Sequence, residues 1–276
     1  MVFRMNRVFP AAICLLASMQ IGCMSGQPDY NSHGVVFYCD GAGGGGITNW
    51  GPGVRKGLAD AGFTGTFDEF SWETGLGVLA DQTESVADKR AQARKLAAQI
   101  KAYKSQYPGS PVHIMGLSAG TAIVPFALEE LPESASVDTA VLLSGSLSSG
   151  YDLTKALRRV RGDMYVTTSP NDTILSGVVP MTGSADRQNV GDDVVGIHGC
   201  HLPPGASAET RRLYSKIVII AWEPSFRQFG DAGGHTDTTN ASFVQHVIAP
   251  LIIREGPRHM QVHPRGSAGT HGKARS

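Results

Sequence analysis

The chain has 276 residues, of which 41% are hydrophobic and 17% are charged, with 24 basic and 24 acidic side chains. This length and apolar content suffice to bury a sizeable core without a partner, and α/β domains of this size are commonly undivided. The balanced charge excludes the strongly basic proteins that bind nucleic acid through charge alone. We therefore expect one globular domain.

The first 22 residues have the pattern of an export signal. Two arginines precede an apolar run over 8–22, which is too short and interrupted to favour a membrane span. The run ends at 20–23, Gln-Ile-Gly-Cys, which is similar to a lipoprotein processing box except that the box prefers leucine in place of glutamine. We expect 1–22 to be a signal peptide and 23–34 a tether. Cys23 is then either acylated, giving a membrane-anchored lipoprotein, or part of a soluble secreted form.

Strand-like and helix-like patterns alternate along the rest of the chain. Apolar runs predict six strands, at 35–39, 66–72, 113–116, 139–144, 163–169 and 216–222. Amphipathic or apolar patterns predict helices at 54–61, 86–107, 121–131, 153–160 and 240–253. Such alternation indicates a mostly parallel sheet of about six strands with helices on both faces.

A nucleophile motif follows the third of these strands. Residues 116–120 read Gly-Leu-Ser-Ala-Gly, between a buried strand and a helix. A serine hydroxyl becomes a useful nucleophile when a sharp strand-to-helix turn lifts it out of the sheet. Gly116 and Gly120 suit such a turn because a Cβ at either position would collide with a neighbouring strand or helix. The alternative for Ser118 is an ordinary turn serine.

A carboxylate lies after the next strand but one. Asp172 follows the strand at 163–169 and precedes a further apolar segment. This strand-to-helix loop is where an acid that orients a histidine belongs. Asp172 could also be a purely local turn residue, since Asp and Asn favour that position. Glu223 and Asp231 are its rivals.

The histidine candidate is His235, in the glycine-rich loop that follows the strand at 216–222. His198 and His201 compete with it, but they lie before that strand rather than after it. These two histidines, near two aspartates, could suggest a metal site. No third ligand is fixed by spacing, so we expect no metal and interpret the long segment 180–215 as a lid.

With these residues, the chain resembles the α/β-hydrolase superfamily, and more loosely its lipases and esterases, over 35–253. The resemblance implies an α/β-hydrolase fold with reduced N-terminal strands and no large cap. It implies that Ser118 attacks an acyl carbonyl, that His235 transfers the proton, and that Asp172 orients His235. No cofactor is implied.

The resemblance also implies an oxyanion hole, formed by the N–H of Ala119 and a second N–H, from Ala42 or Gly43. These two residues lie in the loop 40–46, Asp-Gly-Ala-Gly-Gly-Gly-Gly. Glycines let a substrate approach the backbone amides. Asp40 departs from the His-Gly pattern of many lipases; it could cap local N–H groups, yet its charge would oppose catalysis if it faced the substrate. A phosphate cradle is disfavoured because the loop lacks a P-loop ending.

The expected activity is cleavage of a carboxylic ester, from a small molecule or a lipid, through an acyl-enzyme on Ser118. Amides, thioesters and peptides are alternatives, because the same residues would cleave them. A non-catalytic protein of the cell envelope that keeps the scaffold for binding is the alternative from another class. The oligomeric state is unknown.

Two features remain outside this scheme. In an oxidising compartment Cys39 and Cys200 could form a disulfide, but two buried free thiols are equally expected. The tail at 254–276 is rich in glycine, proline, histidine and basic residues, and we expect it to be disordered.

Overall fold

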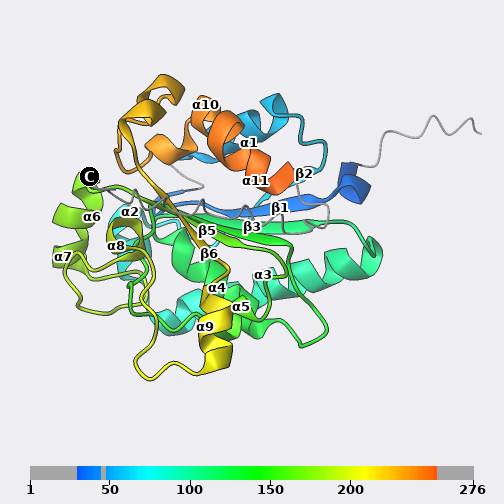
Figure 1. Cartoon of the computed structure of the whole chain (residues 1–276), viewed down its shortest axis with the longest axis horizontal. Helices are drawn as coiled ribbons and strands as arrows, with labels where there is room; N and C mark the ends of the chain where they lie inside the picture. The colour runs from blue at the N-terminus through cyan, green and yellow to red at the C-terminus, as the bar shows by residue number, and fades with distance from the viewer. Residues whose placement is uncertain (1–29, 45–47, 254–276) are drawn as a thin grey trace, which may run out of the picture.

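Six parallel strands form one sheet in the computed structural model of the chain, which describes residues 30–44 and 48–253 (Figure 1). The strands are β1 (Val35–Cys39), β2 (Thr66–Glu69), β3 (Val112–Leu117), β4 (Thr139–Leu143), β5 (Met164–Thr168) and β6 (Ile217–Ala221). They lie in the order β2-β1-β3-β4-β5-β6. The predicted mostly parallel sheet of about six strands is confirmed. The predicted signal peptide, Cys23 and the tail lie outside the described residues.

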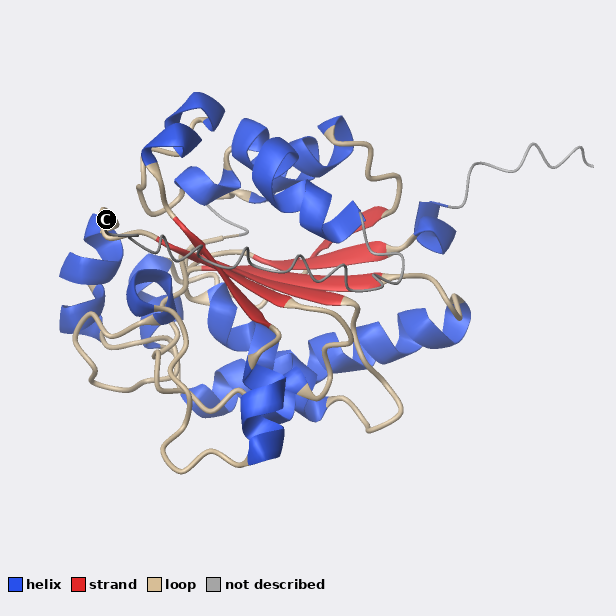
Figure 2. Cartoon of the chain, in the orientation of Figure 1, coloured by secondary structure: helices blue, strands red, loops and turns tan. Residues whose placement is uncertain are grey.

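Helices cover both faces of this sheet (Figure 2). On one face lie α3 (Val86–Gln106), α4 (Gly120–Glu130), α5 (Thr154–Leu157) and α9 (Ala208–Tyr214). On the other lie α1 (Gly51–Asp60), α10 (Ala241–Phe243), the π-helical turn η4 (Val244–Ile248) and α11 (Ala249–Ile253). Such double coverage is the usual environment of a parallel sheet, since its crossover connections place helices on the faces.

Alternate residues of the central strands belong to two hydrophobic cores, one on each face of the sheet. Phe37 and Ile114 pack with α3 and α4 in the larger core, whereas Tyr38 and Met115 pack with α1 and α11 in the other. Side chains of a strand alternate between faces, so strands buried on both sides must be apolar throughout. This explains why the strand patterns could be identified from the sequence.

Short helices surround the carboxyl ends of the strands. They are α2 (Val78–Thr83), α6 (Thr173–Gly177), α7 (Val179–Thr182) and α8 (Val195–His198). The remaining turns are the 3-10 helices η1 (Tyr30–His33), η2 (Pro224–Phe229) and η3 (Asp237–Thr239). Helix α2 was not predicted, and η1 lies within the predicted tether.

Several predicted boundaries were wrong. The helix expected at 153–160 is only the single turn α5, and β2 ends at Glu69 rather than at Trp72. The indole of Trp72 is buried and donates its Nε1–H to the carbonyl of Asp40 at 2.9 Å. The helix expected at 240–253 begins at Ala241, capped by Asn240, and contains the π turn η4. Because α5 is the only helix between β4 and β5, no large cap is inserted there, as expected.

Strand β6 lies at an edge of the sheet, although its sequence is as apolar as that of the central strands. In the described part of the chain it pairs with β5 alone. Its Val218 and Ile219 side chains are 37% and 45% exposed.

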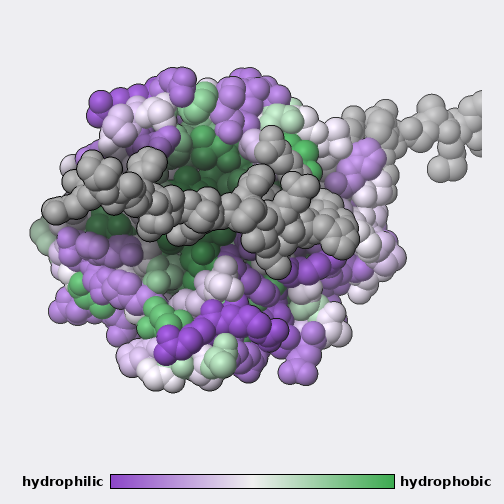
Figure 3. All heavy atoms as spheres, in the orientation of Figure 1, coloured by the Kyte–Doolittle hydropathy of each residue, from purple (hydrophilic) through white to green (hydrophobic). Residues whose placement is uncertain are grey.

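Figure 3 shows polar side chains over much of the face viewed and apolar ones towards its middle. Among the described residues, no helix is both long enough and apolar enough to cross a bilayer.

Candidate active site

Ser118 lies on a sharp turn between β3 and α4. Its backbone φ is +49°, a value that residues other than glycine rarely adopt. A Cβ on Gly116 would lie 2.7 Å from the carbonyl oxygen of Gly120, at the start of α4, and one on Gly120 would lie 2.3 Å from the carbonyl oxygen of Asp40. Both predicted collisions are therefore real, and the two glycines allow the serine turn to form.

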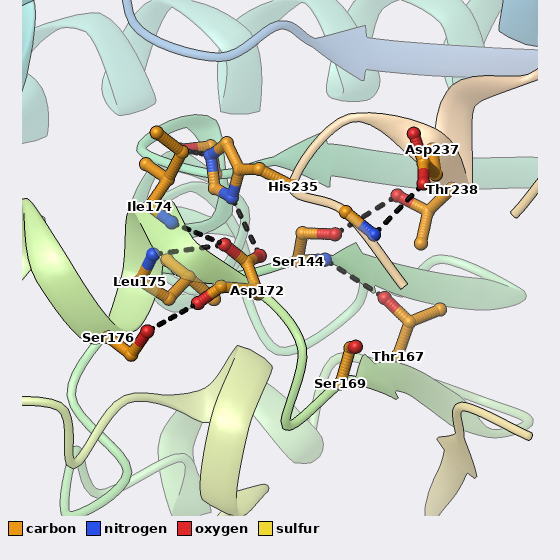
Figure 4. Close-up of polar contacts among 12 residues, drawn as sticks. Ser144, Thr167, Ser169, Asp172, Ile174, Leu175, Ser176, His235, Asp237 and Thr238 are labelled. Atoms are coloured by element: carbon orange, nitrogen blue, oxygen red, sulfur yellow. Dashed lines mark hydrogen bonds and ion pairs between the residues drawn. The ribbon is translucent and has the colours of Figure 1, made fainter. Parts of the chain in front are cut away.

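The histidine and the aspartate reach Ser118 from the carboxyl ends of other strands. Asp172 follows β5, and His235 lies in the loop after β6 and η2. The Nε2 atom of His235 is 2.8 Å from Ser118 Oγ, and its Nδ1 atom is 2.8 Å from Asp172 Oδ2 (the latter pair in Figure 4). The structure thus brings together the three residues singled out in the sequence.

Backbone hydrogen bonds hold the carboxylate of Asp172 beside the histidine ring. Its Oδ1 atom accepts hydrogen bonds from the N–H groups of Ile174 and Leu175, both at 3.0 Å (Figure 4). A carboxylate oxygen accepts hydrogen bonds, so this contact suits the tautomer of His235 that has its proton on Nδ1, and the Nε2 atom of that tautomer can accept a proton from Ser118. Asp172 is also the N-cap of α6. Asp172 therefore caps this helix, as the local interpretation predicted, and its other oxygen contacts His235.

The rival acids do not reach the imidazole. The exposed Glu223 accepts a hydrogen bond from the hydroxyl of Ser225, outside the site. Asp231 is buried, and its carboxylate accepts the N–H of Gly233 at 2.7 Å. Burial raises the pKa of Asp231. Asp231 stabilises the loop that carries His235 instead of orienting its ring.

The rival histidines lie elsewhere. His201 has its Nε2 atom 3.5 Å from Asp193 Oδ1, and His198 borders a shallow surface hollow beside β6. Within residues 30–44 and 48–253 no three His, Cys, Asp or Glu side chains are grouped to hold a metal ion. Only the first residues of the segment 180–215 border the serine site, through Thr182, so the interpretation of the whole segment as a lid was wrong. Its last helix, α9, packs against α5.

Three backbone N–H groups were expected as oxyanion donors, and their contacts differ. Those of Ala119 and Ala42 donate no hydrogen bond to any described residue. The N–H of Gly43 donates to the carboxylate of Asp81, on α2, at 2.7 Å. Of the two donors expected from the glycine loop, Ala42 is therefore available and Gly43 is engaged.

Asp40 does not face the substrate as a free charge. Its carboxylate accepts hydrogen bonds from the N–H groups of Gly41, at 2.8 Å, and Trp50, at 3.0 Å, and from the Tyr38 hydroxyl, at 2.9 Å. The side chain is buried, and burial raises the pKa of its carboxyl group. Asp40 thus caps the loop, which was the favourable of the two expectations for it.

A cleft of about 500 Å³ opens over Ser118 and His235. One wall is α2, with Val78 and Leu79, and a second wall is formed by α6, α7 and Val178 between them, with Ile174 among its residues. Several of the apolar side chains that line it are exposed to solvent: Val78 55%, Leu79 66%, Ile174 41% and Val178 39%. The site is therefore an apolar groove rather than an open surface.

Buried and partly buried polar contacts join α2 to the segment that follows α7. The Gln82 side chain donates to the carbonyl of Gly183 at 2.9 Å. The fully buried Lys89 donates through Nζ to the carbonyls of Gln82 and Ala185, at 3.1 and 3.0 Å. Burial lowers the pKa of Lys89 to about 8. Neither residue was singled out in the sequence, since their partners Gly183 and Ala185 lie far away in the chain and form no motif.

Both described cysteines are free thiols. Cys39 is buried at the end of β1, and Cys200 packs partly against the same core. Burial raises the pKa of both thiols, that of Cys200 to about 12. Of the two possibilities considered for these cysteines, the structure contains the free thiols.

Comparisons with known proteins find similarity in structure but not in sequence. No protein-family profile matches the chain, and no curated protein sequence does. A cutinase-like protein from Cryptococcus sp. is 15% identical, with 77% of this chain and 89% of that chain aligned and a TM-score of 0.41. An acetylxylan esterase is 16% identical, with 78% and 90% aligned and a TM-score of 0.39. A poly(3-hydroxybutyrate) depolymerase from Bordetella parapertussis is 14% identical, with 82% and 83% aligned and a TM-score of 0.43.

The fold assignment rests on the chain's own topology. The sheet is entirely parallel, its helices lie on both faces, and a strained serine turn joins β3 to α4. The acid candidate follows β5 and the histidine follows β6. By this arrangement the protein has the α/β-hydrolase fold.

Proposed function

We propose that this protein is a serine hydrolase that cleaves carboxylic esters through an acyl-enzyme on Ser118. The observation that carries the proposal is the unbroken series of contacts from Ser118 Oγ to His235 Nε2 and from His235 Nδ1 to Asp172 Oδ2, each 2.8 Å long. Nucleophile, base and orienting acid stand in hydrogen-bond contact before any substrate is bound.

In the proposed first step, Ser118 Oγ bonds to the carbonyl carbon of the ester while His235 Nε2 takes the hydroxyl proton. Asp172 stabilises the imidazolium that forms. When the tetrahedral intermediate collapses, the bond to the alcohol oxygen breaks and His235 returns the proton to that oxygen. A water molecule then attacks the acyl carbon while His235 takes one of its protons. The bond from that carbon to Ser118 Oγ breaks, His235 returns the proton to Oγ, and the carboxylic acid leaves.

The negative charge of each intermediate falls on the former carbonyl oxygen. The free N–H groups of Ala119 and Ala42 are the proposed donors to it. Fixed backbone donors stabilise a developing oxyanion without reorganising as the reaction proceeds. Every step uses side chains and backbone groups of this chain.

A fluorophosphonate probe tests the proposal, because it labels a serine only when the serine is activated. We expect the wild type to be labelled at Ser118 and to hydrolyse p-nitrophenyl acetate. The Ser118→Ala variant should lose both properties, with turnover reduced on the order of 10⁶-fold. Ser144→Ala is the matched control, because Ser144 is also a buried serine with a positive φ, of +43°, but its hydroxyl contacts Thr238. An unlabelled wild type would instead favour the non-catalytic envelope protein.

Comparison of p-nitrophenyl esters with the corresponding anilides and thioesters separates the possible leaving groups. We expect the ester to be cleaved much faster than the anilide, because p-nitrophenolate leaves with little help from the histidine whereas the anilide nitrogen must be protonated before it leaves. An anilide cleaved as fast as the ester would turn the proposal towards an amidase or peptidase.

We also propose that the chain is exported through residues 1–22, with Cys23 acylated. The support is the sequence pattern alone, two arginines, an apolar run and a small residue before cysteine. Radiolabelled palmitate should be incorporated into the wild type and not into Cys23→Ala. A wild type that is exported without label would point to a secreted form.

A further inference from the structure

The buried carboxylate of Asp81, on α2, accepts a hydrogen bond from the loop that contains the proposed oxyanion donor Ala42. Asp81 is 1% exposed, and its Oδ2 atom accepts the N–H of Gly43 at 2.7 Å. Its Oδ1 atom accepts the N–H of Thr74 at 2.8 Å and the Thr74 hydroxyl at 2.5 Å. Three donors converge on this carboxylate, which as an ionised group can accept all of them.

The N–H group that donates to Asp81 belongs to a tight turn over residues 41–44. The N–H of Gly44 donates to the carbonyl of Gly41 at 2.9 Å, and Gly43 has a φ of +84°, as the third residue of a type II turn requires. The Thr48 hydroxyl donates to the Gly43 carbonyl at 2.9 Å. Both polar groups of Gly43 are therefore held, and the Ala42–Gly43 peptide has little freedom to rotate.

Packing joins the same turn to α2 a second time. A Cβ on Gly43 would lie 2.6 Å from Cγ2 of Val78, so only glycine lets the turn approach the helix this closely. Val78 and Leu79 of α2 line the cleft, whereas Asp81 does not. One helix therefore forms a wall of the cleft and also anchors the turn that carries Ala42.

From these contacts we infer that Asp81 is a positioning residue for the oxyanion hole, acting through Gly43. By accepting the Gly43 N–H, it fixes the turn in the conformation that leaves the Ala42 N–H free beside Ser118. The inference rests on the proposed function, because it concerns the stabilisation of the same intermediate. It identifies a residue that no motif reveals and that does not touch the substrate.

A purely structural role for Asp81 makes a different prediction. If Asp81 only held α2 in place, its loss would disturb the apolar wall, and long acyl chains would bind less well. An acetyl group presents almost no apolar surface to that wall, so acetate esters would be unaffected. If Asp81 positions the turn, acetate and long-chain esters lose turnover alike, since both form the same oxyanion.

The experiment is kinetics of Asp81→Asn with p-nitrophenyl acetate and octanoate. An asparagine has a single side-chain oxygen, so its NH₂ group must face either Gly43 or Thr74, both of which are donors. We expect kcat to fall roughly 10- to 100-fold for both esters with KM within about twofold, somewhat less than direct loss of an oxyanion donor costs. An acetate kcat within twofold of wild type in a folded variant overturns the inference.

The matched control is Asp138→Asn. Asp138 also accepts a backbone N–H, that of Val112 at 2.8 Å, but at the amino-terminal end of the strands. We expect this variant to lose stability and to keep its kcat for both esters. An equal fall of kcat in the control would show that loss of any carboxylate that accepts a backbone N–H reduces turnover, and would overturn a specific role for Asp81.

A second pair of variants applies if Asp81→Asn does not fold. Thr74 is exposed, and Thr74→Val removes the hydroxyl that donates to Asp81, whereas Thr74→Ser keeps it. We expect a several-fold lower acetate kcat for valine and near wild-type turnover for serine, and equal turnover would contradict the inference. A wild type that is neither labelled nor active would instead overturn the proposed function, so the two failures differ.

Discussion

The Nε2 atom of His235 lies 2.8 Å from Ser118 Oγ, although 117 positions separate the two residues in the chain. The contact exists because β3 and β6 run in the same direction, so the loops that follow them both lie at the carboxyl ends of the strands. Ligand sites of parallel α/β sheets form at these ends for the same reason.

Replacing Asp172 with asparagine should reduce kcat on the order of 10⁴-fold without unfolding the protein. The amide oxygen can still accept the N–H groups of Ile174 and Leu175, which places NH₂ towards His235 and favours the wrong tautomer of the ring. Steady-state hydrolysis of p-nitrophenyl acetate measures the loss, and circular dichroism checks the fold. A kcat within tenfold of wild type would show that Asp172 is only a helix cap.

Gly120→Ala should destabilise the protein by about 3 kcal/mol or more, because the new Cβ would lie 2.3 and 2.4 Å from the carbonyl oxygens of Asp40 and Cys39. Urea unfolding measures the change. Gly150→Ala is the control, since a Cβ there meets nothing within 4 Å. Equal stability of the two variants would mean that the backbone at the carboxyl end of β1 shifts at little energetic cost to accommodate the new Cβ.

Leu79→Ser should raise KM for p-nitrophenyl octanoate several-fold and leave p-nitrophenyl acetate unchanged. Leu79 is 66% exposed on the α2 wall of the cleft, so its side chain can contact an extended acyl chain. Ile219→Ser serves as the control, because Ile219 is also an exposed apolar residue, 45%, but lies on β6 outside the cleft. The same KM for octanoate in all three proteins would place the acyl chain elsewhere.

His113 should make the protein sensitive to acid. Its side chain is buried on β3, its Nδ1 atom has no hydrogen-bond partner among the described residues, and burial lowers its pKa from 6.5 to about 4. Between these values the unfolded chain binds a proton that the folded chain does not, so stability falls as the pH decreases from 6.5 towards 4. The loss is on the order of 3 kcal/mol.

The measurement is urea unfolding of the wild type and His113→Leu across this pH range. The free energy of unfolding of the wild type should fall relative to that of the variant as the pH decreases. If the two curves remain parallel, His113 takes up its proton in the folded state without penalty.

Cys39 and Cys200 should react with a thiol reagent only after the protein is denatured. Both are free, and burial raises the pKa of each, which lowers the fraction of reactive thiolate. Alkylation of native and denatured protein, followed by peptide mass spectrometry, gives the result for each cysteine separately. A peptide in which the two are joined by a disulfide would contradict the free thiols.

The residues of the candidate site could be predicted because each has a signal close to it in the sequence. Ser118 lies in a glycine-flanked pentapeptide between a strand and a helix, and Asp172 and His235 each follow an apolar strand. Parallel strands bring such loops to one edge, so chain order alone indicated that the three residues meet.

The features that were missed depend on contacts between distant segments. Asp81 and Gly43 are 38 positions apart and share no motif. Helix α2 is six residues long and leaves Val78 and Leu79 in solvent, so it shows no buried stripe. The edge position of β6 was equally hidden, because its apolar sequence resembles that of a central strand. These features depend on packing between distant segments, which the local sequence pattern does not reveal.

The all-parallel sheet also affects how the chain acquires its site. Every strand pairs with a neighbour that is distant in sequence, and such non-local pairing is slow to form. His235 is carried by the loop after β6, a strand that pairs, within residues 30–44 and 48–253, with β5 alone. During refolding, recovery of helical signal should therefore precede the return of Ser118 labelling. Labelling of Ser118 should therefore show when β6 and the loop that carries His235 have joined the sheet.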